Sequence, residues 1–334
     1  MTELIINETL QKYFHGKRIL ITGASGYLAG NLMSFLKNIP CSLKRLSREP
    51  TLPFLNGKAD VLDIQGNISE MSVWERALND TDIVFHFAGQ TSVYVADKDP
   101  ESDYMVNVLP IMYMLEVCKK IKSCPDILFA GTSTQMGLPK DLPVNEEPQD
   151  NPVTIYDLHK LMAESYLKYY SRLGIVRGVT LRLTNVYGPG PKSSSEDRGI
   201  INTMTRRSLK GENLTLYGQG EFIRDYIYVD DVISAFLHAA INMSSLNQKY
   251  FVLGSGKGYS ILEALQHIVD RISLKNGNQV AIQSIDHPKG LSAIEKRNFI
   301  ADSQAFSQIT GWRPKNSLID GIDKTLEAFL KLGE

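Results

Sequence analysis

The chain has 334 residues, of which 43% are hydrophobic and 22% are charged, and its formal net charge is −1. This length and apolar content predict one large domain, or two interlocked ones, around a well-buried core. The balanced charge excludes a strongly basic surface, so we do not expect a nucleic acid partner.

The cysteines, Cys41, Cys118 and Cys124, are odd in number and lack CxxC spacing, and the chain opens without a secretory signal pattern. A reduced, cytoplasmic protein is therefore predicted. No apolar run reaches the roughly 18 residues of a membrane helix, so no membrane partner is expected. The histidines are scattered. We expect His86 and His159 to be polar framework residues, and we expect no metal site.

Short runs of β-branched and aromatic residues alternate with longer amphipathic stretches. After a leading helix within residues 1–16, strands are predicted at 18–22 (RILIT), 82–88 (DIVFHFA), 126–132 (DILFAGT), 178–186 (GVTLRLTNV) and 226–231 (YIYVDD). Helices are predicted over 104–122 and 156–172, and a polar loop over 192–197 (KSSSED). This alternation predicts an α/β fold with a Rossmann-like, doubly wound parallel sheet that helices cover on both faces.

The segment ILITGASGYLAGNLMSFL combines a strand, a glycine-rich turn and a helix. Gly23 permits the tight turn, and Gly26 lets the backbone approach a pyrophosphate. The helix N-terminus then offers N–H groups and a partial positive charge to the phosphates. A dinucleotide site is therefore predicted here. Its other members are Ser25, Tyr27 and Leu28.

The domain boundaries follow from this motif and from the less regular pattern after the polar loop. We expect a dinucleotide-binding domain over 1–186, together with a segment of about 226–254 that returns to the main sheet. A smaller C-terminal, substrate-binding lobe is expected over 187–225 and 255–334.

The second strand ends in SLKRLSREP, where NAD-binding folds usually place a carboxylate for the ribose 2′-hydroxyl. Ser47 and Arg48 stand there instead, and an arginine suits the 2′-phosphate of NADP. We therefore expect NAD or NADP, with a preference for NADP. The alternative is that Arg48 is a solvated loop cation. Asn67 and Ile68, after a further strand, are expected to flank the adenine.

Tyr156 and Lys160, in the run YDLHK, are four residues apart and so share one face of a predicted helix. A neighbouring ammonium favours the phenolate and lowers a tyrosine pKa from its ordinary value of about 10. Tyr156 is therefore a candidate proton carrier. The same spacing also occurs on solvated helix faces, so the pair gains its meaning from the other motifs.

Over nearly its whole length the chain resembles the extended short-chain dehydrogenase/reductases, in particular the NAD(P)-dependent nucleotide-sugar epimerases and dehydratases. Five features carry the resemblance in the family's order: TGASGYLA, HFAG at 86–89, GTSTQMG at 131–137, YDLHK, and the late pair LRLTNVYGPG and FIRDYIYVDD. The resemblance implies an NDP-sugar substrate, an NAD or NADP cofactor, and a homodimer formed through the helices of 104–122 and 156–172.

The resemblance also implies roles for individual residues. It makes Thr132 the partner of the reacting sugar hydroxyl, Tyr156 the acid/base, and Lys160 the residue that holds the nicotinamide ribose. Further cofactor contacts are implied at Ala88, Gly89, Gln90 and Asn107. Substrate contacts are implied at Ser133, Asn185, Asn202, Tyr217, Arg224 and Arg297, with Lys289 as an alternative to Arg297.

Two departures from the family pattern bear on the reaction. Thr132 is followed by Ser133, Thr134 and Gln135, whereas dehydratases and decarboxylases of the family have an acid there. Loss of water or CO₂ therefore lacks its usual second acid or base. Met136 replaces a usual tyrosine and alters the floor of the sugar site.

These features predict an epimerase acting at C4 of an NDP-hexose through a transient 4-keto sugar. The alternative is an NADP-dependent NDP-4-keto-sugar reductase, which Ser47 and Arg48 favour. A dehydratase or decarboxylase, or a non-catalytic NAD(P)-binding protein, is less expected.

Overall fold

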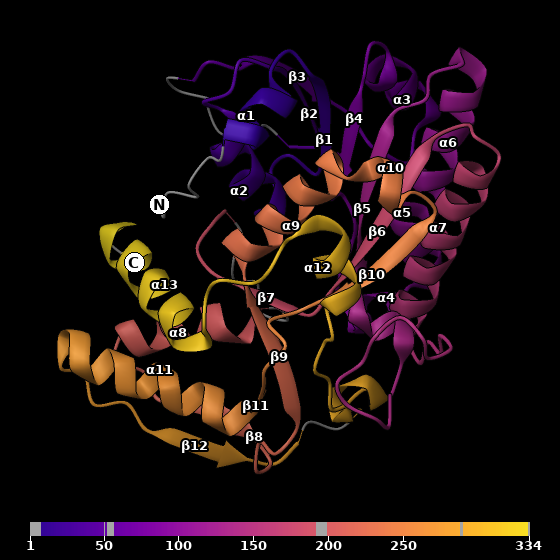
Figure 1. Cartoon of the computed structure of the whole chain (residues 1–334). Coiled ribbons are helices and arrows are strands. Elements are labelled where there is room, and N and C mark those ends of the chain that lie inside the picture. Colours follow the sequence, from indigo (N-terminus) through magenta and orange to yellow (C-terminus); the bar gives the residue numbers. More distant parts are fainter. Residues whose placement is uncertain (1–7, 50, 52–56, 192–198, 288–289, 333–334) are drawn as a thin grey trace.

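The computed structural model describes residues 8–49, 51, 57–191, 199–287 and 290–332. Within these residues the main sheet has seven strands in the order β10-β6-β5-β4-β1-β2-β3, and every neighbouring pair is parallel (Figure 1). The strands are β1 (Arg18–Thr22), β2 (Ser42–Ser47), β3 (Asp60–Gln65), β4 (Ile83–His86), β5 (Asp126–Thr132), β6 (Arg177–Leu183) and β10 (Lys249–Leu253). The predicted parallel α/β sheet is confirmed.

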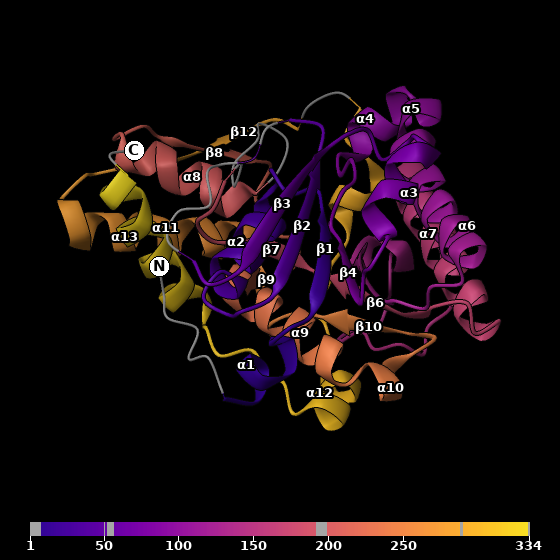
Figure 2. The ribbon, with the colours of Figure 1, turned by 90° about the horizontal axis from the view of Figure 1, so that it is seen from above.

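Helices cover both faces of this sheet, because alternate strand residues point to opposite sides and the central strands β1, β4 and β5 carry buried apolar side chains toward both. One face packs on α1 (Glu8–Phe14), α2 (Tyr27–Leu36), α9 (Val229–Ile241) and α10 (Met243–Leu246). The other packs on α3 (Met71–Leu78), α5 (Pro100–Asn107), α6 (Leu109–Ile121) and α7 (Ile155–Arg172). Figure 2, seen from above, separates these two helical layers. The short α4 (Val93–Lys98) packs against α5 and α7.

Two small sheets lie beyond the carboxyl ends of the main strands (Figure 1). The first contains β7 (Asn185–Tyr187), β9 (Ile223–Tyr228) and β11 (Gly258–Ser260), and the second pairs β8 (Leu214–Tyr217) with β12 (Ile282–Ile285). Helices α8 (Ile200–Leu209), α11 (Ile261–Asn276) and α13 (Leu318–Leu332) pack together beside them, and α12 (Gln304–Thr310) packs on β10. Since β10 joins the main sheet, the chain crosses between the two parts more than once.

Three predicted elements differ from the observed ones. The helix expected over 104–122 is two helices, α5 and α6, which meet at Val108 because Pro110 in the first turn of α6 has no N–H to continue α5. The strand expected over 178–186 is β6 and β7, in different sheets. The strand expected over 226–231 ends at Tyr228. Asp230 and Asp231 instead lie in the first turn of α9, where a helix favours negative charge.

The loop predicted over 192–197 lies outside the described residues. None of the helices in the described ranges is long and apolar enough to span a membrane.

Candidate functional site

The glycine turn between β1 and α2 leaves no room for side chains. Gly23 has φ +66°, and a Cβ there would lie 2.9 Å from both the Cα and the N of Ala88. The N–H of Gly26 donates to the Gly23 carbonyl at 2.7 Å, and Gly26 is the N-cap of α2. No described side chain caps this helix, so its first N–H groups stay available to an anion. The turn therefore has the form of a phosphate cradle.

The other predicted members of the turn serve partly to hold it. Ser25 is half-buried within the turn. The hydroxyl of Tyr27 donates to the Gly188 carbonyl at 3.0 Å, which ties α2 to the loop after β7. Leu28 packs against the main core.

The end of β2 presents one exposed cation. Ser47 is buried and its hydroxyl donates to the Glu49 carbonyl, whereas Arg48 is exposed. Asn67 is exposed, and its Oδ1 accepts from the Ser69 N–H at 3.1 Å. Ile68 is buried in the core. Of the predicted adenosine contacts, the side chains of Arg48 and Asn67 thus remain accessible.

A buried carboxylate organises the segment that follows β4. Asp103 of α5 accepts from Gln90 at 2.7 Å, from Asn107 at 2.9 Å and from His159 Nδ1 at 2.7 Å. Asn107 Nδ2 also donates to the Gln90 carbonyl at 3.0 Å. The side chain of Gln90 is therefore engaged in holding this segment in place. His159 has the framework role predicted for it, because its ring is bonded to the buried Asp103 carboxylate.

Asn107 carries an unpaired acceptor beside Gly89. Its Oδ1 is buried without a hydrogen-bond partner among the described residues, and a Cβ on Gly89 would lie 2.7 Å from it. Because buried polar atoms are normally paired, such an atom marks a place where a ligand or water completes the bonding.

His86 and Thr22 hold the start of the segment that follows β4. Thr22 Oγ1 accepts from the N–H groups of Phe87 and Ala88, each at 3.1 Å. Its own proton therefore goes to His86 Nδ1 at 2.9 Å, which puts the imidazole proton on Nε2. Burial and the nearby charge of Lys160 lower the pKa of His86 to about 3. His86 is thus a neutral framework residue, as predicted.

Tyr156 and Lys160 lie in the first turns of α7 and are both buried. Lys160 Nζ lies 4.2 Å from the centroid of the Phe129 ring, so this face of α7 packs on β5. Burial lowers the pKa of Lys160 to about 7, while the carboxylates of Asp103 and Glu164 act in the opposite direction.

Thr132 is the last residue of β5 and lies at the carboxyl edge of the main sheet. It is partly exposed, and its Oγ1 lies 2.9 Å from the Oγ1 of Thr134. It also caps a short 3₁₀ helix, η1 (Ser133–Met136), in which Ser133 is buried. Met136 packs in a small apolar cluster that includes Phe299.

Two buried arginines lie close together near β9. Arg224 donates to the backbone carbonyls of Glu295 at 2.6 Å and of Arg297, and it faces the Glu295 carboxylate at 3.6 Å. Arg297 Nη1 donates to the Ile294 carbonyl at 3.0 Å, but its Nε has no partner within the part of the chain described. Burial and the charge of Arg224 lower the pKa of Arg297 to about 10. A bound anion would relieve this repulsion.

The remaining predicted substrate residues differ in their burial and in their hydrogen bonds. Asn185 donates to the Asp225 carbonyl at 3.2 Å. Asn202 is fully buried and its Oδ1 accepts from the Gly188 N–H at 2.9 Å, so its side chain holds the loop after β7. Tyr217 is 49% exposed and stacks on His287 with centroids 6.5 Å apart. Lys289 lies outside the described residues.

Several buried polar residues were not singled out as site residues from the sequence. Asp157 follows Tyr156 and is completely buried, and neither of its oxygens has a hydrogen-bond partner in the described structure. Burial raises its pKa, and the nearby hydroxyls of Thr134 and Thr154 act against this. Its place inside YDLHK was the available signal. Asp103 and Glu164 had no comparable signal, because their partners His159 and Arg182 are distant in sequence.

Comparisons with known proteins agree with this geometry. The family model described as "NAD dependent epimerase/dehydratase family" matches residues 19–254. UDP-glucose 4-epimerase of Mycolicibacterium smegmatis is 26% identical over 93% of this chain and 98% of that protein. The dTDP-4-dehydro-6-deoxyglucose reductase of Escherichia coli is 26% identical over 93% of this chain and 96% of that protein.

A solved structure of UDP-glucose 4-epimerase from Thermotoga maritima, with UDP-glucose, is similar to this chain with a TM-score of 0.83 and 27% identity. The match covers 95% of this chain and 100% of that one. The resemblance inferred from the motifs is confirmed, and this chain belongs to the NAD dependent epimerase/dehydratase family of enzymes.

Proposed function

We propose that the protein is an NAD(P)-dependent nucleotide-sugar epimerase that inverts C4 of an NDP-hexose through a transient 4-keto sugar. The observation that carries this proposal is the meeting of α7 and β5. Tyr156 and Lys160 lie on the face of α7 that packs on β5, and Thr132 ends that strand. Ligands of open parallel sheets bind at this carboxyl edge, where the Gly23 turn also lies.

The residues present fit a nicotinamide dinucleotide. A Cβ on Gly23 or Gly26 would meet backbone atoms at 2.9 Å, and the start of α2 offers N–H groups to phosphates. The unpaired Oδ1 of Asn107 lies beside Gly89 at the neighbouring strand end. Bound NAD(P) supplies a reversible hydride acceptor at the reacting carbon. Arg48 supports a preference for NADP, as its exposed guanidinium suits a 2′-phosphate.

Side chains of the protein transfer the proton of the sugar hydroxyl. Tyr156, as phenolate, accepts the proton of the C4 hydroxyl as that carbon is oxidised, and it returns the proton when the ketone is reduced on its other face. Lys160, in its ammonium form, favours the phenolate. Thr132 donates a hydrogen bond to the same sugar oxygen. Since positions 133 and 134 are Ser and Thr, no carboxylate follows Thr132 to assist elimination of water.

Arg224, Arg297 and Asn185 are the proposed anchor of the substrate diphosphate. An anchor matters for an epimerase, because remote binding energy must retain the keto sugar while its ring turns over. The exposed ring of Tyr217 is the proposed platform for the nucleobase.

An NADP-dependent NDP-4-keto-sugar reductase is the second candidate. Arg48 at the end of β2 favours it, because reductive biosynthesis usually consumes NADPH, and a relative named as a reductase aligns over nearly the whole chain. Thermal-shift screening of NDP-sugars followed by product NMR separates the two. An epimerase interconverts two NDP-sugars without added reductant, and a reductase consumes NADPH in proportion to product.

We further propose a cytoplasmic homodimer with no nucleic acid or membrane partner. The support for the homodimer is that α6 and α7 pack side by side on one flank (Figure 1) and expose Ile121, Leu158 and Tyr169, each at least 41%. Light scattering on the purified protein checks the oligomeric state.

A further inference from the structure

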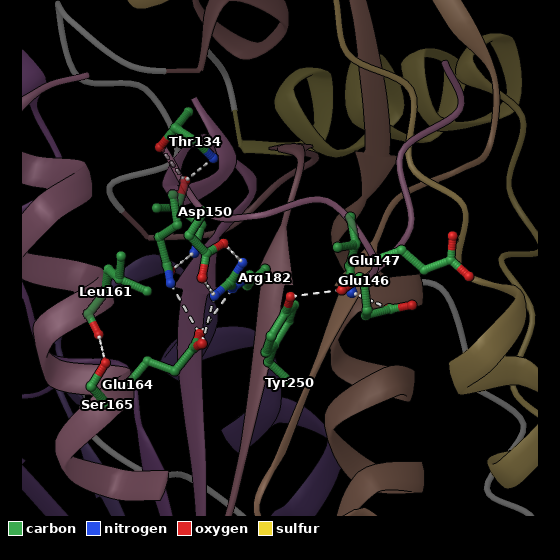
Figure 3. Close-up of polar contacts among 12 residues, drawn as sticks. Thr134, Glu146, Glu147, Asp150, Leu161, Glu164, Ser165, Arg182 and Tyr250 are labelled. Atoms are coloured by element: carbon green, nitrogen blue, oxygen red, sulfur yellow. Dashed lines mark hydrogen bonds and ion pairs between the residues drawn. The ribbon is translucent and has the colours of Figure 1, made fainter. Parts of the chain in front are cut away.

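A buried ionic cluster lies beside β5, around the neighbouring strand β6. Arg182 of β6 is 0% exposed, and its guanidinium forms bidentate pairs with both Asp150 and Glu164 (Figure 3). The two bonds to Glu164 measure 2.9 and 2.6 Å. The Tyr250 ring covers the guanidinium, with its centroid 3.6 Å from Cζ. These contacts fix the position of the Glu164 carboxylate.

Gln135 joins this cluster to Thr132. The backbone N–H of Thr132 donates to Gln135 Oε1 at 2.9 Å. Because that oxygen is the acceptor, the other end of the amide is a donor, and Gln135 Nε2 donates to Glu164 Oε2 at 3.0 Å. Gln135 is 0% exposed, so water does not compete for either bond.

Glu164 belongs to the active face of α7. It follows Lys160 by four residues and Tyr156 by eight, so the three side chains lie along one face of the helix. The bonds from Thr132 through Gln135 to Glu164 therefore join the strand that carries the threonine to the helix face that carries the tyrosine and the lysine.

Stability alone is a weak explanation for this cluster. It buries one guanidinium with two carboxylates. Replacing buried ion pairs by apolar side chains of similar size is often neutral or stabilising. The chain of hydrogen bonds from Arg182 through Glu164 and Gln135 to Thr132 is better explained by a need to fix the position of the threonine.

We propose that Gln135 and Glu164 are positioning residues that hold Thr132 at the correct distance from Tyr156 and Lys160 during proton transfer. The inference rests on the proposed function, because it requires these three residues to act on one sugar hydroxyl. Arg182 holds Glu164 in turn.

The first test is Gln135→Met, which keeps the volume but removes both bonds. The readout is the single-turnover rate of hydride transfer, followed as the redox state of the nicotinamide, which an epimerase and a reductase both support. We expect this rate to fall by about tenfold to a hundredfold, as a misplacement of about 1 Å does. The KM for the NDP-sugar should stay within about twofold of the wild-type value, since ground-state binding is not changed.

The matched control is Asp150→Asn, on the far side of Arg182. It weakens the same cluster and leaves the bonds of Gln135 in place, so we expect a lower Tm and a wild-type hydride-transfer rate. A wild-type rate in Gln135→Met, or an equal loss of rate in Asp150→Asn, would overturn the proposal.

If Gln135→Met does not fold, Glu164→Gln decides, because it keeps the shape of the side chain. Glu164→Gln removes the carboxylate that accepts from Gln135 Nε2 at 3.0 Å. The hydride-transfer rate should fall by about tenfold or more, while the KM for the NDP-sugar stays within about twofold of the wild-type value. A wild-type rate in Glu164→Gln overturns the proposal. If the wild-type protein transfers hydride but interconverts no epimers, the proposed function fails while the variants still decide the positioning.

Discussion

Lys160 Nζ lies 4.2 Å from the centroid of the Phe129 ring, so the lysine of the predicted catalytic pair packs on the strand that ends in Thr132. A desolvated cation over an aromatic face is worth about 2 kcal/mol. This contact brings together two halves of the candidate site that are 28 residues apart in sequence, counted from Thr132 to Lys160. Substitutions in either half should therefore affect the same reaction.

Tyr156→Phe should lower kcat by about a hundredfold or more, because it removes the proton acceptor and little volume. Binding of the NDP-sugar and of the nicotinamide should persist. Steady-state kinetics together with calorimetric titration check both parts. A variant with nearly wild-type turnover would assign the proton transfer to another group.

Lys160→Met should change how stability depends on pH. Burial lowers the pKa of Lys160 from 10.5 to about 7, so between these values the unfolded chain binds a proton that the folded chain does not. Stability due to this group therefore rises with pH across that window. Urea unfolding of both proteins from pH 7 to 10 should show the wild type gaining relative to the variant. A constant difference would mean that Lys160 titrates alike in both states.

Gly23→Ala should abolish cofactor binding and destabilise the fold. The substitution adds a Cβ 2.9 Å from the backbone of Ala88 at a φ of +66°. Gly16→Ala is the matched control, since Gly16 has φ +72° and a Cβ there would meet no other atom within 4 Å. It should cost only about 1–2 kcal/mol of left-handed strain and retain cofactor. Nicotinamide content and Tm check both variants. Equal losses in the two would remove the case for a phosphate cradle.

Arg297→Gln should raise the KM for the NDP-sugar about tenfold or more, because it removes a charged donor from the proposed diphosphate anchor. Arg271→Gln is the control. Arg271 of α11 pairs with Asp323 of α13 at 2.6 Å and is not a member of the proposed anchor, so its loss should leave KM unchanged. Steady-state kinetics of both variants with the same NDP-sugar measures the two KM values. An unchanged KM in Arg297→Gln would place the diphosphate elsewhere.

Arg48→Ala should weaken NADP binding by about tenfold and leave NAD binding unchanged, since only NADP has a 2′-phosphate for the exposed guanidinium. Titration of each cofactor measures the ratio. Equal effects on both cofactors would make Arg48 the solvated loop cation of the alternative interpretation.

The parts of the fold that depend on local pattern were predictable. The strand, the glycines and the helix at Gly23 are contiguous, and Tyr156 and Lys160 are one helical turn apart, so their geometry follows from backbone rules. The alternation of elements likewise predicted the parallel sheet.

Relationships between distant segments were not predictable. Gln135 contacts Glu164, which contacts Arg182, and no periodicity links these positions. The bond from the Gly188 N–H to the Asn202 side chain likewise had no local signal in the sequence. The break between α5 and α6 had a local signal in Pro110, but the apolar spacing on both sides favoured one helix.

The most direct test of the central claim uses an NDP-hexose with deuterium at C4, incubated with the purified protein without added reductant. If Tyr156 moves the hydroxyl proton while bound nicotinamide takes and returns the hydrogen of C4, NMR should show both C4 epimers with deuterium retained at that carbon. Loss of deuterium to solvent, or product only with stoichiometric NADPH, would contradict the account.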